Sequence, residues 1–214
     1  MKQIDFHLDF ISPYAYLAFA KLPEALAGID CHVRYKPVLF AALLKHHGQL
    51  GPAEIAAKRD WTYRQVQWLA HEHGVALDLP AAHPFNPLAL LRLALATVPA
   101  GDPGREACTV IFDHVWRGGL DATDPARIAA LTQALAPVRD PAGGEVKVEL
   151  GQNTDAAIRQ GIFGVPAFVV DGRQFWGFDS LPMLRAWLDG DSWFDSGVWE
   201  APARIAVGAA RRKA

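Results

Sequence analysis

The most constraining feature of the sequence is a strict alternation of apolar and polar side chains near its start. The apolar side of residues 3–10 carries Ile4, Phe6, Leu8 and Phe10, and the polar side carries Gln3, Asp5, His7 and Asp9. A period of two predicts a half-buried strand. Ser12 and Pro13 then begin an apolar helical stretch that Pro23 kinks or ends, and residues 31–38 form a second predicted strand. This succession predicts a βαβ unit with a right-handed crossover.

Residues 39 to about 160 are predicted to be helical throughout. A short helix is expected over 39–46, a longer one over 54–73, and another over 144–160. Three more helices are expected to begin where a capping side chain precedes proline. These pairs are Asn86-Pro87, Asp102-Pro103 and Asp124-Pro125.

Strand character returns near the end of the chain. Residues 167–170 and 174–176 flank Asp171-Gly172, which is typical of a tight hairpin turn. A final helix is expected from Asp179. The element order predicts an α/β fold, with a sheet domain of residues 1–38 and 161–190 and an all-helical insertion of residues 39–160. Residues 191–214 are expected to form a loosely attached tail.

Composition and charge exclude several classes of protein. Hydrophobic residues make up 51% of the chain, which is enough for a sizeable core, and a formal charge of −2 gives no positive field for binding nucleic acid. Cys31 and Cys108 form neither a CxxC pair nor a disulfide framework, as expected in a reducing compartment. The start of the chain lacks signal-peptide character, and the apolar stretch over 88–98 is too short to span a bilayer. We therefore expect a cytoplasmic protein.

Motifs for common chemistries are missing from the sequence. The histidines His46, His47, His71 and His73 do not have metal-ligand spacing, and the sequence contains no HExxH, GxGxxG or GxSxG motif. We therefore expect no bound metal. What remains is Ser12-Pro13, which is either an ordinary helix cap or part of a site.

A second segment favours a site. Val165-Pro166 comes directly before a predicted strand and is a candidate cis peptide bond. A strand followed by Ser-Pro and a helix, together with a final ββα unit after Val-Pro, is the layout of a thioredoxin-like fold. In such a fold, the start of the first helix and the loop before the cis-proline are neighbours.

Three motifs together resemble one family. They are FHLDFISPYAYLA from Phe6, KPVLFAALLKHHGQLGP from Lys36 and FGVPAFVVDGRQFWGFD from Phe163. The chain resembles 2-hydroxychromene-2-carboxylate isomerases over residues 3 to about 190. These proteins are related to kappa-class glutathione transferases and, more distantly, to bacterial disulfide oxidoreductases. Where the oxidoreductases have Cys-x-x-Cys, this chain has Ser12-Pro13-Tyr14-Ala15, which removes dithiol chemistry.

The resemblance implies a glutathione cofactor and a set of site residues. Ser12 is implied to hold the glutathione thiolate as the catalytic residue. The other implied glutathione contacts are Val165, Trp176, Gly177, Phe178 and Asp179. An alternative explanation of Asp179 is that it is an ordinary helix N-cap.

Further residues are implied to bind the aromatic carboxylate substrate. They are Lys45, Phe85 and Asn86, with Lys45 pairing with the substrate carboxylate. The chain has Ala53-Glu54 where the naphthalene-pathway enzyme has an asparagine-arginine pair. This departure removes a cation, for which Lys58 or Arg64 is a candidate replacement, although solvated helix faces explain both.

The function implied by the resemblance is glutathione-dependent interconversion of 2-hydroxychromene-2-carboxylate and trans-o-hydroxybenzylidenepyruvate. Two alternatives stay open: a kappa-like transferase that consumes glutathione, and a non-catalytic thioredoxin-like binding module. The expected partners are a small aromatic carboxylate and a second copy of the chain in a homodimer, without nucleic acid or membrane.

Overall fold

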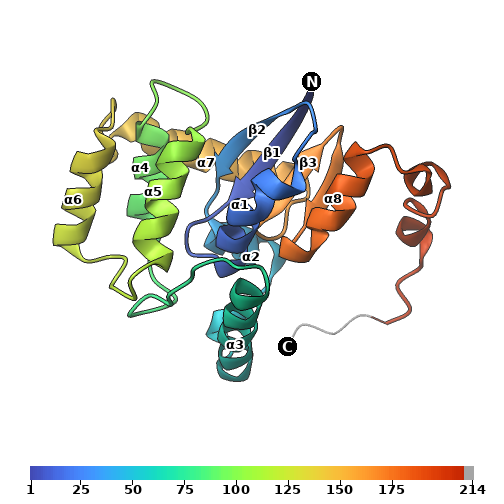
Figure 1. Cartoon of the computed structure of the whole chain (residues 1–214), viewed down its shortest axis with the longest axis horizontal. Coiled ribbons are helices and arrows are strands. Elements are labelled where there is room, and N and C mark those ends of the chain that lie inside the picture. The colour runs from blue at the N-terminus through green and yellow to red at the C-terminus, as the bar shows by residue number, and fades with distance from the viewer. Residues whose placement is uncertain (210–214) are drawn as a thin grey trace.

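The computed structural model describes residues 1–209, and its four strands form a single mixed sheet (Figure 1). The strand order is β2-β1-β3-β4. β1 (Lys2–Leu8) pairs in parallel with β2 (Cys31–Pro37) and antiparallel with β3 (Ala167–Val170). β3 pairs antiparallel with β4 (Arg173–Trp176). Strands from the first and last quarters of the chain are thus joined in one sheet, as the thioredoxin-like prediction requires.

The turn between β3 and β4 has the predicted form. Asp171 and Gly172 both have positive φ angles, 50° and 76°. Two successive residues of this kind match the right-handed twist of a tight hairpin. The hairpin is confirmed, with β4 beginning one residue earlier than predicted.

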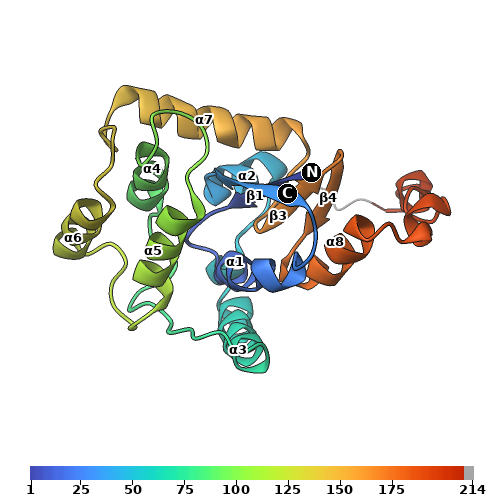
Figure 2. The same cartoon turned by 45° about the horizontal axis from the view of Figure 1, so that its top comes forward.

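Helices cover both faces of the sheet (Figure 2). α1 (Pro13–Ala25) and α8 (Leu181–Leu188) lie on one face, and α7 (Gly144–Arg159) lies on the other. Pro23 is accommodated inside α1, which ends two residues later. The β1–α1–β2 unit therefore forms as predicted, with α1 as its crossover helix.

The regular elements between β2 and β3 in the described chain are all helical. They are α2 (Phe40–His47), a 3-10 turn (Pro52–Glu54), α3 (Ala56–Glu72), α4 (Leu88–Ala96), α5 (Arg105–Trp116), α6 (Pro125–Leu135) and α7. In residues 1–209, no helix has both the length and the apolar character needed to cross a bilayer.

The three predicted helix starts have different outcomes. Asp124 caps α6 as predicted and accepts a hydrogen bond from the Arg127 amide at 2.9 Å. Asn86 accepts from the Leu88 amide at 3.1 Å but is not the N-cap, because α4 begins at Leu88 with Pro87 as its N-cap. The prediction for Asp102 is wrong, because α5 begins at Arg105 with Gly104 as its N-cap.

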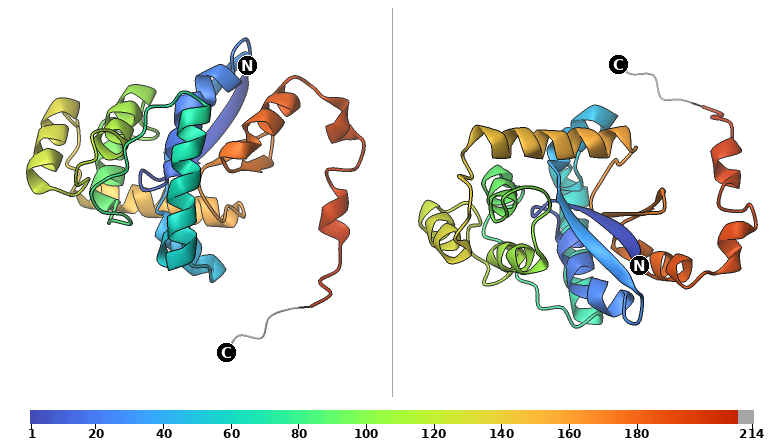
Figure 3. Two further views of the ribbon diagram at one scale, coloured as in Figure 1. Left: turned by 60° about the horizontal axis from the view of Figure 1, so that its bottom comes forward. Right: turned by 90° about the horizontal axis from the view of Figure 1, so that it is seen from above.

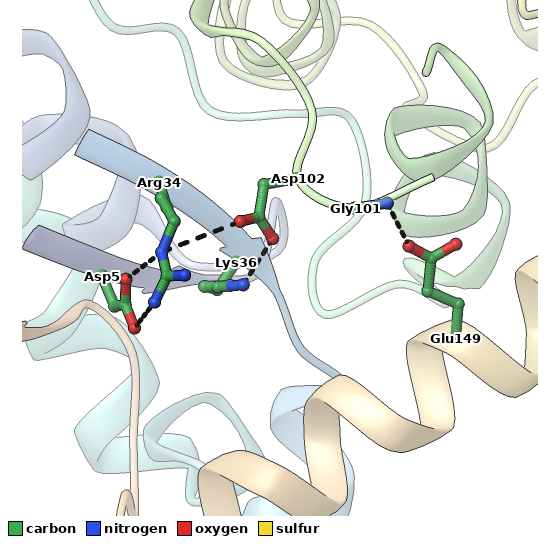
Figure 4. A network of polar contacts seen from close by, with 6 residues as sticks. All are labelled: Asp5, Arg34, Lys36, Gly101, Asp102 and Glu149. Atoms are coloured by element: carbon green, nitrogen blue, oxygen red, sulfur yellow. Dashed lines mark hydrogen bonds and ion pairs between the residues drawn. The ribbon is translucent and has the colours of Figure 1, made fainter. Parts of the chain in front are cut away.

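Asp102 instead joins the helical segment to the sheet (Figure 4). Its carboxylate lies 2.7 Å from the Lys36 ammonium and 3.9 Å from the guanidinium of Arg34. Arg34 also makes two hydrogen bonds of 2.6 Å to Asp5. Beside this network, the Gly101 amide donates to Glu149 of α7 at 2.9 Å. The loop before α5 is therefore held by both the sheet and α7.

The sheet and the helices share one apolar core. Phe6 of β1 stacks on Phe168 of β3, with ring centroids 4.6 Å apart. Phe10 packs edge-on against Phe112 of α5 at 4.8 Å, and Phe19 of α1 lies 4.9 Å from the same ring. This continuous cluster reaches from the sheet to α4 and α5. The helical segment is therefore packed against the sheet and is not merely tethered to it.

The C-terminal segment is more firmly attached than predicted. Phe194 is buried, and Trp199 packs against Phe175 of β4 at 5.6 Å. The Arg173 guanidinium lies 4.1 Å from the ring centroid of Trp187 and 3.5 Å from Glu200. Figure 3 shows the segment running along the side formed by β4 and α8. The prediction of a loose tail is thus wrong for residues 191–200, and residues 210–214 lie outside the described part of the chain.

The expectation that β1 is half-buried is also wrong at its carboxyl end. His7 and Asp9, on the polar side of the alternation, are both buried, because helices cover that face too. Burial lowers the pKa of His7 to about 4. Polar side chains in this strand therefore do not mark a solvent-exposed face.

Asp9 is the most constrained of these polar groups. Its carboxylate is fully buried and accepts hydrogen bonds from the amides of Ile11 at 3.1 Å and Phe40 at 2.9 Å. Burial raises the pKa of Asp9 from 3.8 to about 7, although the amide donors oppose the rise. One side chain thereby holds both the turn after β1 and the start of α2.

Asp9 makes the stability of the fold depend on pH in a defined direction. As pH rises from about 4 to 7, the unfolded chain releases a proton that the folded protein retains, so the free energy of unfolding falls. Between pH 5 and 8 this contribution is about 2–3 kcal/mol, at about 1.4 kcal/mol for each pH unit. We expect Asp9→Asn to remove the decrease in the free energy of unfolding that Asp9 causes, as measured by urea unfolding at pH 5 and pH 8. His7 contributes equally to both proteins and cancels, and an identical pH dependence would contradict the prediction.

Candidate active site

A cleft of about 1290 Å³ lies between the start of α1, the loop before β3 and the start of α8 on one side, and α2, α3 and residues 83–87 on the other. α3 extends beyond the body formed by the other helices (Figure 1). The cleft wall is mostly apolar and includes Phe40, Leu44, Leu50 and Pro84. It is large enough for a peptide-sized ligand and a second small molecule.

The cleft brings together every residue that the sequence assigned to glutathione. These residues are Ser12, Val165, Trp176, Gly177, Phe178 and Asp179. They come from the beginning and the end of the chain, which the pairing of β1 with β3 joins. The residues that the resemblance implied for glutathione therefore lie together in one half of the cleft, and their role stays a prediction.

Ser12 lies at the N-terminus of α1 and is nearly buried. Its hydroxyl oxygen accepts a hydrogen bond from the Ala15 amide at 3.2 Å, and the hydroxyl donates to the Val165 carbonyl at 3.4 Å. The cap interpretation is thus correct, but the same hydroxyl also reaches the neighbouring loop before β3, on the same side of the cleft. The positive end of the helix dipole at this point favours an anion. Among its hydrogen-bond partners there is no base that would activate Ser12 as a nucleophile.

The loop that precedes β3 lies beside Ser12 in the cleft wall. The peptide bond between Val165 and Pro166 is cis, as predicted. The Trp176 indole packs over Gly164, where an added Cβ would lie 2.7 Å from the indole nitrogen. The indole also lies 4.9 Å from the Phe163 ring. These contacts hold the backbone of residue 165 against the cleft.

The turn into α8 is built around Gly177. Its φ of 95° suits glycine, and a Cβ at this position would lie 2.4 Å from the Asp179 carboxylate. Its amide donates to the Pro166 carbonyl at 2.9 Å, and its carbonyl accepts from the Ser180 hydroxyl at 2.8 Å. Ser180, not Asp179, is the N-cap residue of α8. The expectation that Asp179 caps this helix is therefore wrong, and capping does not account for its exposed carboxylate.

The residues predicted to bind the aromatic substrate are only partly brought together. Phe85 lines the cleft, whereas Lys45 and Asn86 do not. Lys45 is exposed in the last turn of α2, four residues after Ala41, which does line the cleft. Asn86 is turned to the start of α4.

The replacement cations are not in the wall either, because Lys58 and Arg64 are exposed on α3 and do not line the cleft. Glu54 is in the wall, and its carboxylate accepts from the Gly51 amide at 2.6 Å. The departure from the family pattern at residues 53–54 thus places a carboxylate in the cleft.

Three wall residues were missed by sequence reasoning. Asp9 was assigned to a solvent-exposed face, and His83 was not singled out. The Tyr14 hydroxyl donates to Gln65 of α3 at 2.7 Å, although Tyr14 appeared in the sequence only as part of the Ser-Pro motif. The available signal for Asp9 was an acidic residue three positions before a Ser-Pro helix start. His83 contacts Ile11 across 72 positions of sequence, so no local pattern could have identified it.

The lysine and arginine side chains in the described part of the wall are already engaged within the protein. Lys21 contacts Glu24, and Arg185 binds Asp189 at 2.7 Å and the Ala27 carbonyl at 2.7 Å. Neither cysteine lines the cleft, and burial raises the pKa of the Cys108 thiol. The cleft therefore offers a hydroxyl, a helix N-terminus and a backbone edge beside an apolar cavity, and its wall, within residues 1–209, contains no thiol.

Comparisons with known proteins agree with this geometry. The chain is 30% identical to a 2-hydroxychromene-2-carboxylate isomerase of Sphingobium xenophagum, over 87% of this chain and 98% of that protein. It is 24% identical to human glutathione S-transferase kappa 1, over 90% of this chain and 92% of that protein. A solved structure of a 2-hydroxychromene-2-carboxylate isomerase superimposes with a TM-score of 0.75 at 23% identity. That match covers 95% of this chain and all of the other, and it shows the shared fold.

The match to a domain family is almost as long as the chain. Residues 3–189 match the DSBA-like thioredoxin domain. The matched range takes in all four strands and the helices from α1 to α8. The chain therefore belongs to the DSBA-like thioredoxin domain family and, within it, to the family of 2-hydroxychromene-2-carboxylate isomerases.

Proposed function

We propose that this protein is a glutathione-dependent isomerase that interconverts 2-hydroxychromene-2-carboxylate and trans-o-hydroxybenzylidenepyruvate or a close analogue. The observation that carries the proposal is the position of the Ser12 hydroxyl. It lies at the N-terminus of α1, beside the Val165 carbonyl, in an apolar cleft to which the chain contributes no thiol. The named isomerase relative at 30% identity supports the reaction class.

The cleft residues fit glutathione by their chemistry. The backbone at Val165 forms an edge of the cleft to which an extended peptide can add like a further strand. The carboxylate of Asp179 is exposed and does not cap α8, so it is free to receive the ammonium group of a γ-glutamyl end. Ser12 and the start of α1 suit a thiolate between these two contacts.

When bound, glutathione supplies a thiol whose thiolate adds reversibly to a conjugated system, which permits rotation about a former double bond. The task of Ser12 is to favour the thiolate. A free thiol with a pKa near 8.5 is only about 3% ionised at pH 7, and lowering the pKa to about 6.5 needs about 2.7 kcal/mol. A hydrogen bond to a charged acceptor gives about 1.5–3 kcal/mol, and a helix N-terminus gives about 0.3–1 kcal/mol. Together they give about 1.8–4 kcal/mol, a range that includes the required value without a metal or a histidine base.

A glutathione-conjugating transferase is the second candidate. Lys21 and Arg185 are the lysine and arginine side chains of the described residues that line the cleft, and both are engaged elsewhere. With Glu54 also in the wall, a substrate carboxylate has less support here than the resemblance implies. The similarity to human glutathione S-transferase kappa 1 is consistent with this alternative.

One assay separates these candidates. The protein is incubated with glutathione and 2-hydroxychromene-2-carboxylate, and both the isomer ratio and total free glutathione are followed. Isomerisation with constant glutathione supports the proposal, whereas thioether formation with loss of glutathione supports the transferase. Absence of glutathione binding in calorimetry would contradict both and leave a non-catalytic binding module.

The first prediction from the proposed function concerns Ser12→Ala. Removing the hydroxyl should raise the pKa of the bound glutathione thiol by at least about one unit and reduce turnover roughly tenfold to a hundredfold. Loss of the cap alone should cost about 1 kcal/mol of stability. Ultraviolet titration of the thiolate and a thermal melt on the same variant measure both effects. Asp124→Ala is a matched control, because it removes the cap of α6 far from Ser12 in the sequence and should lower stability without moving the thiol pKa.

The second prediction concerns Gly177→Ala. The added methyl group displaces the Asp179 carboxylate, so the affinity for glutathione in calorimetry should fall about tenfold or more. Gly172→Ala is the control, since Gly172 also has a positive φ but has nothing within 4 Å of an added Cβ. Gly172→Ala should lower the free energy of unfolding without changing the affinity for glutathione. Equal affinities of the two variants would argue against a role for Asp179 in binding.

The third prediction concerns Lys45→Ala. Because Lys45 is exposed at the rim, a pair with a substrate carboxylate is worth about 0.2–1 kcal/mol. The Michaelis constant for the aromatic substrate should therefore rise no more than about fivefold, with glutathione affinity unchanged within about twofold. Steady-state kinetics with each substrate varied in turn measures both. A rise well above tenfold would mean that Lys45 enters the cleft when the substrate binds.

A further inference from the structure

The His83 side chain links the wall of the cleft to the residue before Ser12. Its Nε2 atom lies 2.8 Å from the Ile11 carbonyl oxygen. Its Nδ1 atom lies 2.8 Å from the hydroxyl of Tyr63, which is also 3.0 Å from the His83 carbonyl. The imidazole is therefore held between α3 and the turn that follows β1.

The contact with Ile11 defines the hydrogen position on Nε2, because the Ile11 carbonyl can only accept. The Tyr63 hydroxyl has a single hydrogen, which it can donate either to Nδ1 or to the His83 carbonyl. Burial lowers the pKa of His83, in keeping with the neutral form. Both ring nitrogens are used within the protein. The geometry therefore favours a holding role for His83 over a role as general base.

The residue that His83 holds is constrained from both sides. The Ile11 amide donates to the Asp9 carboxylate at 3.1 Å, and the Ile11 carbonyl accepts from His83. That carbonyl belongs to the peptide bond that ends at the Ser12 nitrogen, which in turn donates to the Asp9 carbonyl at 3.0 Å. The orientation of this peptide plane fixes where the backbone of Ser12 begins, and hence where its hydroxyl points.

We infer that His83, oriented by Tyr63, is a positioning residue that sets the direction of the Ser12 hydroxyl through the Ile11 carbonyl. The inference rests on the proposed function, in which Ser12 stabilises the glutathione thiolate. Substrate and glutathione need not touch His83 for it to act. Loss of the His83 imidazole should change the pKa of the bound thiol and the turnover more than the affinity for glutathione.

The test is His83→Phe, which keeps an aromatic ring and removes the donor to Ile11. We expect the pKa of the bound glutathione thiol to rise by about half a unit or more and kcat to fall about fivefold to tenfold. The dissociation constant for glutathione should change by less than about twofold. His83→Gln, whose amide can donate to the same carbonyl, should restore most of the loss. Tyr63→Phe, outside the cleft wall, should give a smaller change in the same direction and provides a second variant if His83→Phe fails to fold.

His114→Phe is the matched control. The Nε2 atom of His114 also contacts a backbone carbonyl, that of Ala122 at 2.9 Å, but His114 does not line the cleft. This variant should lose stability without a change in the thiol pKa or kcat.

The outcomes separate this inference from the proposed function. A wild-type thiol pKa and kcat in both His83→Phe and Tyr63→Phe would overturn the inference, and so would equal losses in His83→Phe and His83→Gln. If Ser12→Ala shifts the thiol pKa while these variants do not, the proposed function stands and only the inference fails. If Ser12→Ala itself leaves the thiol pKa unchanged, both are overturned.

Discussion

The fold and its cleft depend on one buried carboxylate. Asp9 ends the first strand and binds the amides of Ile11, which begins the site turn, and Phe40, which begins α2. Burying a carboxyl group is unfavourable unless its oxygens accept hydrogen bonds. The position of Asp9 therefore determines the positions of these two backbone amides. The two walls of the cleft thereby share an anchor in the sheet.

The helical segment extends this arrangement and is not an independent unit. The phenylalanine contacts run from β1 through α1 to α5, and Asp102 pairs with Lys36 of the sheet. The indole of Trp116 at the end of α5 also donates to the Phe10 carbonyl at 2.9 Å, within the turn that precedes Ser12. A cleft wall made by helices is thus tied to the backbone that carries the hydroxyl.

Local sequence patterns predicted those elements whose structure is determined by neighbouring residues. The β1–α1–β2 unit, the Asp-Gly hairpin and the cap at Asp124 follow from periodicity and turn chemistry, and the structure has each of them. Burial of Asp9 and the pairing of Asp102 depend on which distant element covers them, so no sequence window contains that information. The roles of Lys45 and Asn86 came from the resemblance alone, and neither side chain lines the cleft, so both roles stay predictions.

The hydrogen bond from Ser12 to Val165 joins residues that are 153 positions apart. During synthesis the chain emerges from its amino end, so the first strand and helix exist long before the loop that completes the cleft. The partner strand β3 and the turn at Gly177 are both made in the last quarter of the chain. A ligand that contacts both Ser12 and the turn at Gly177 can therefore bind only after the last quarter of the chain has folded onto the first strand, and its binding favours that closed state over shorter chains.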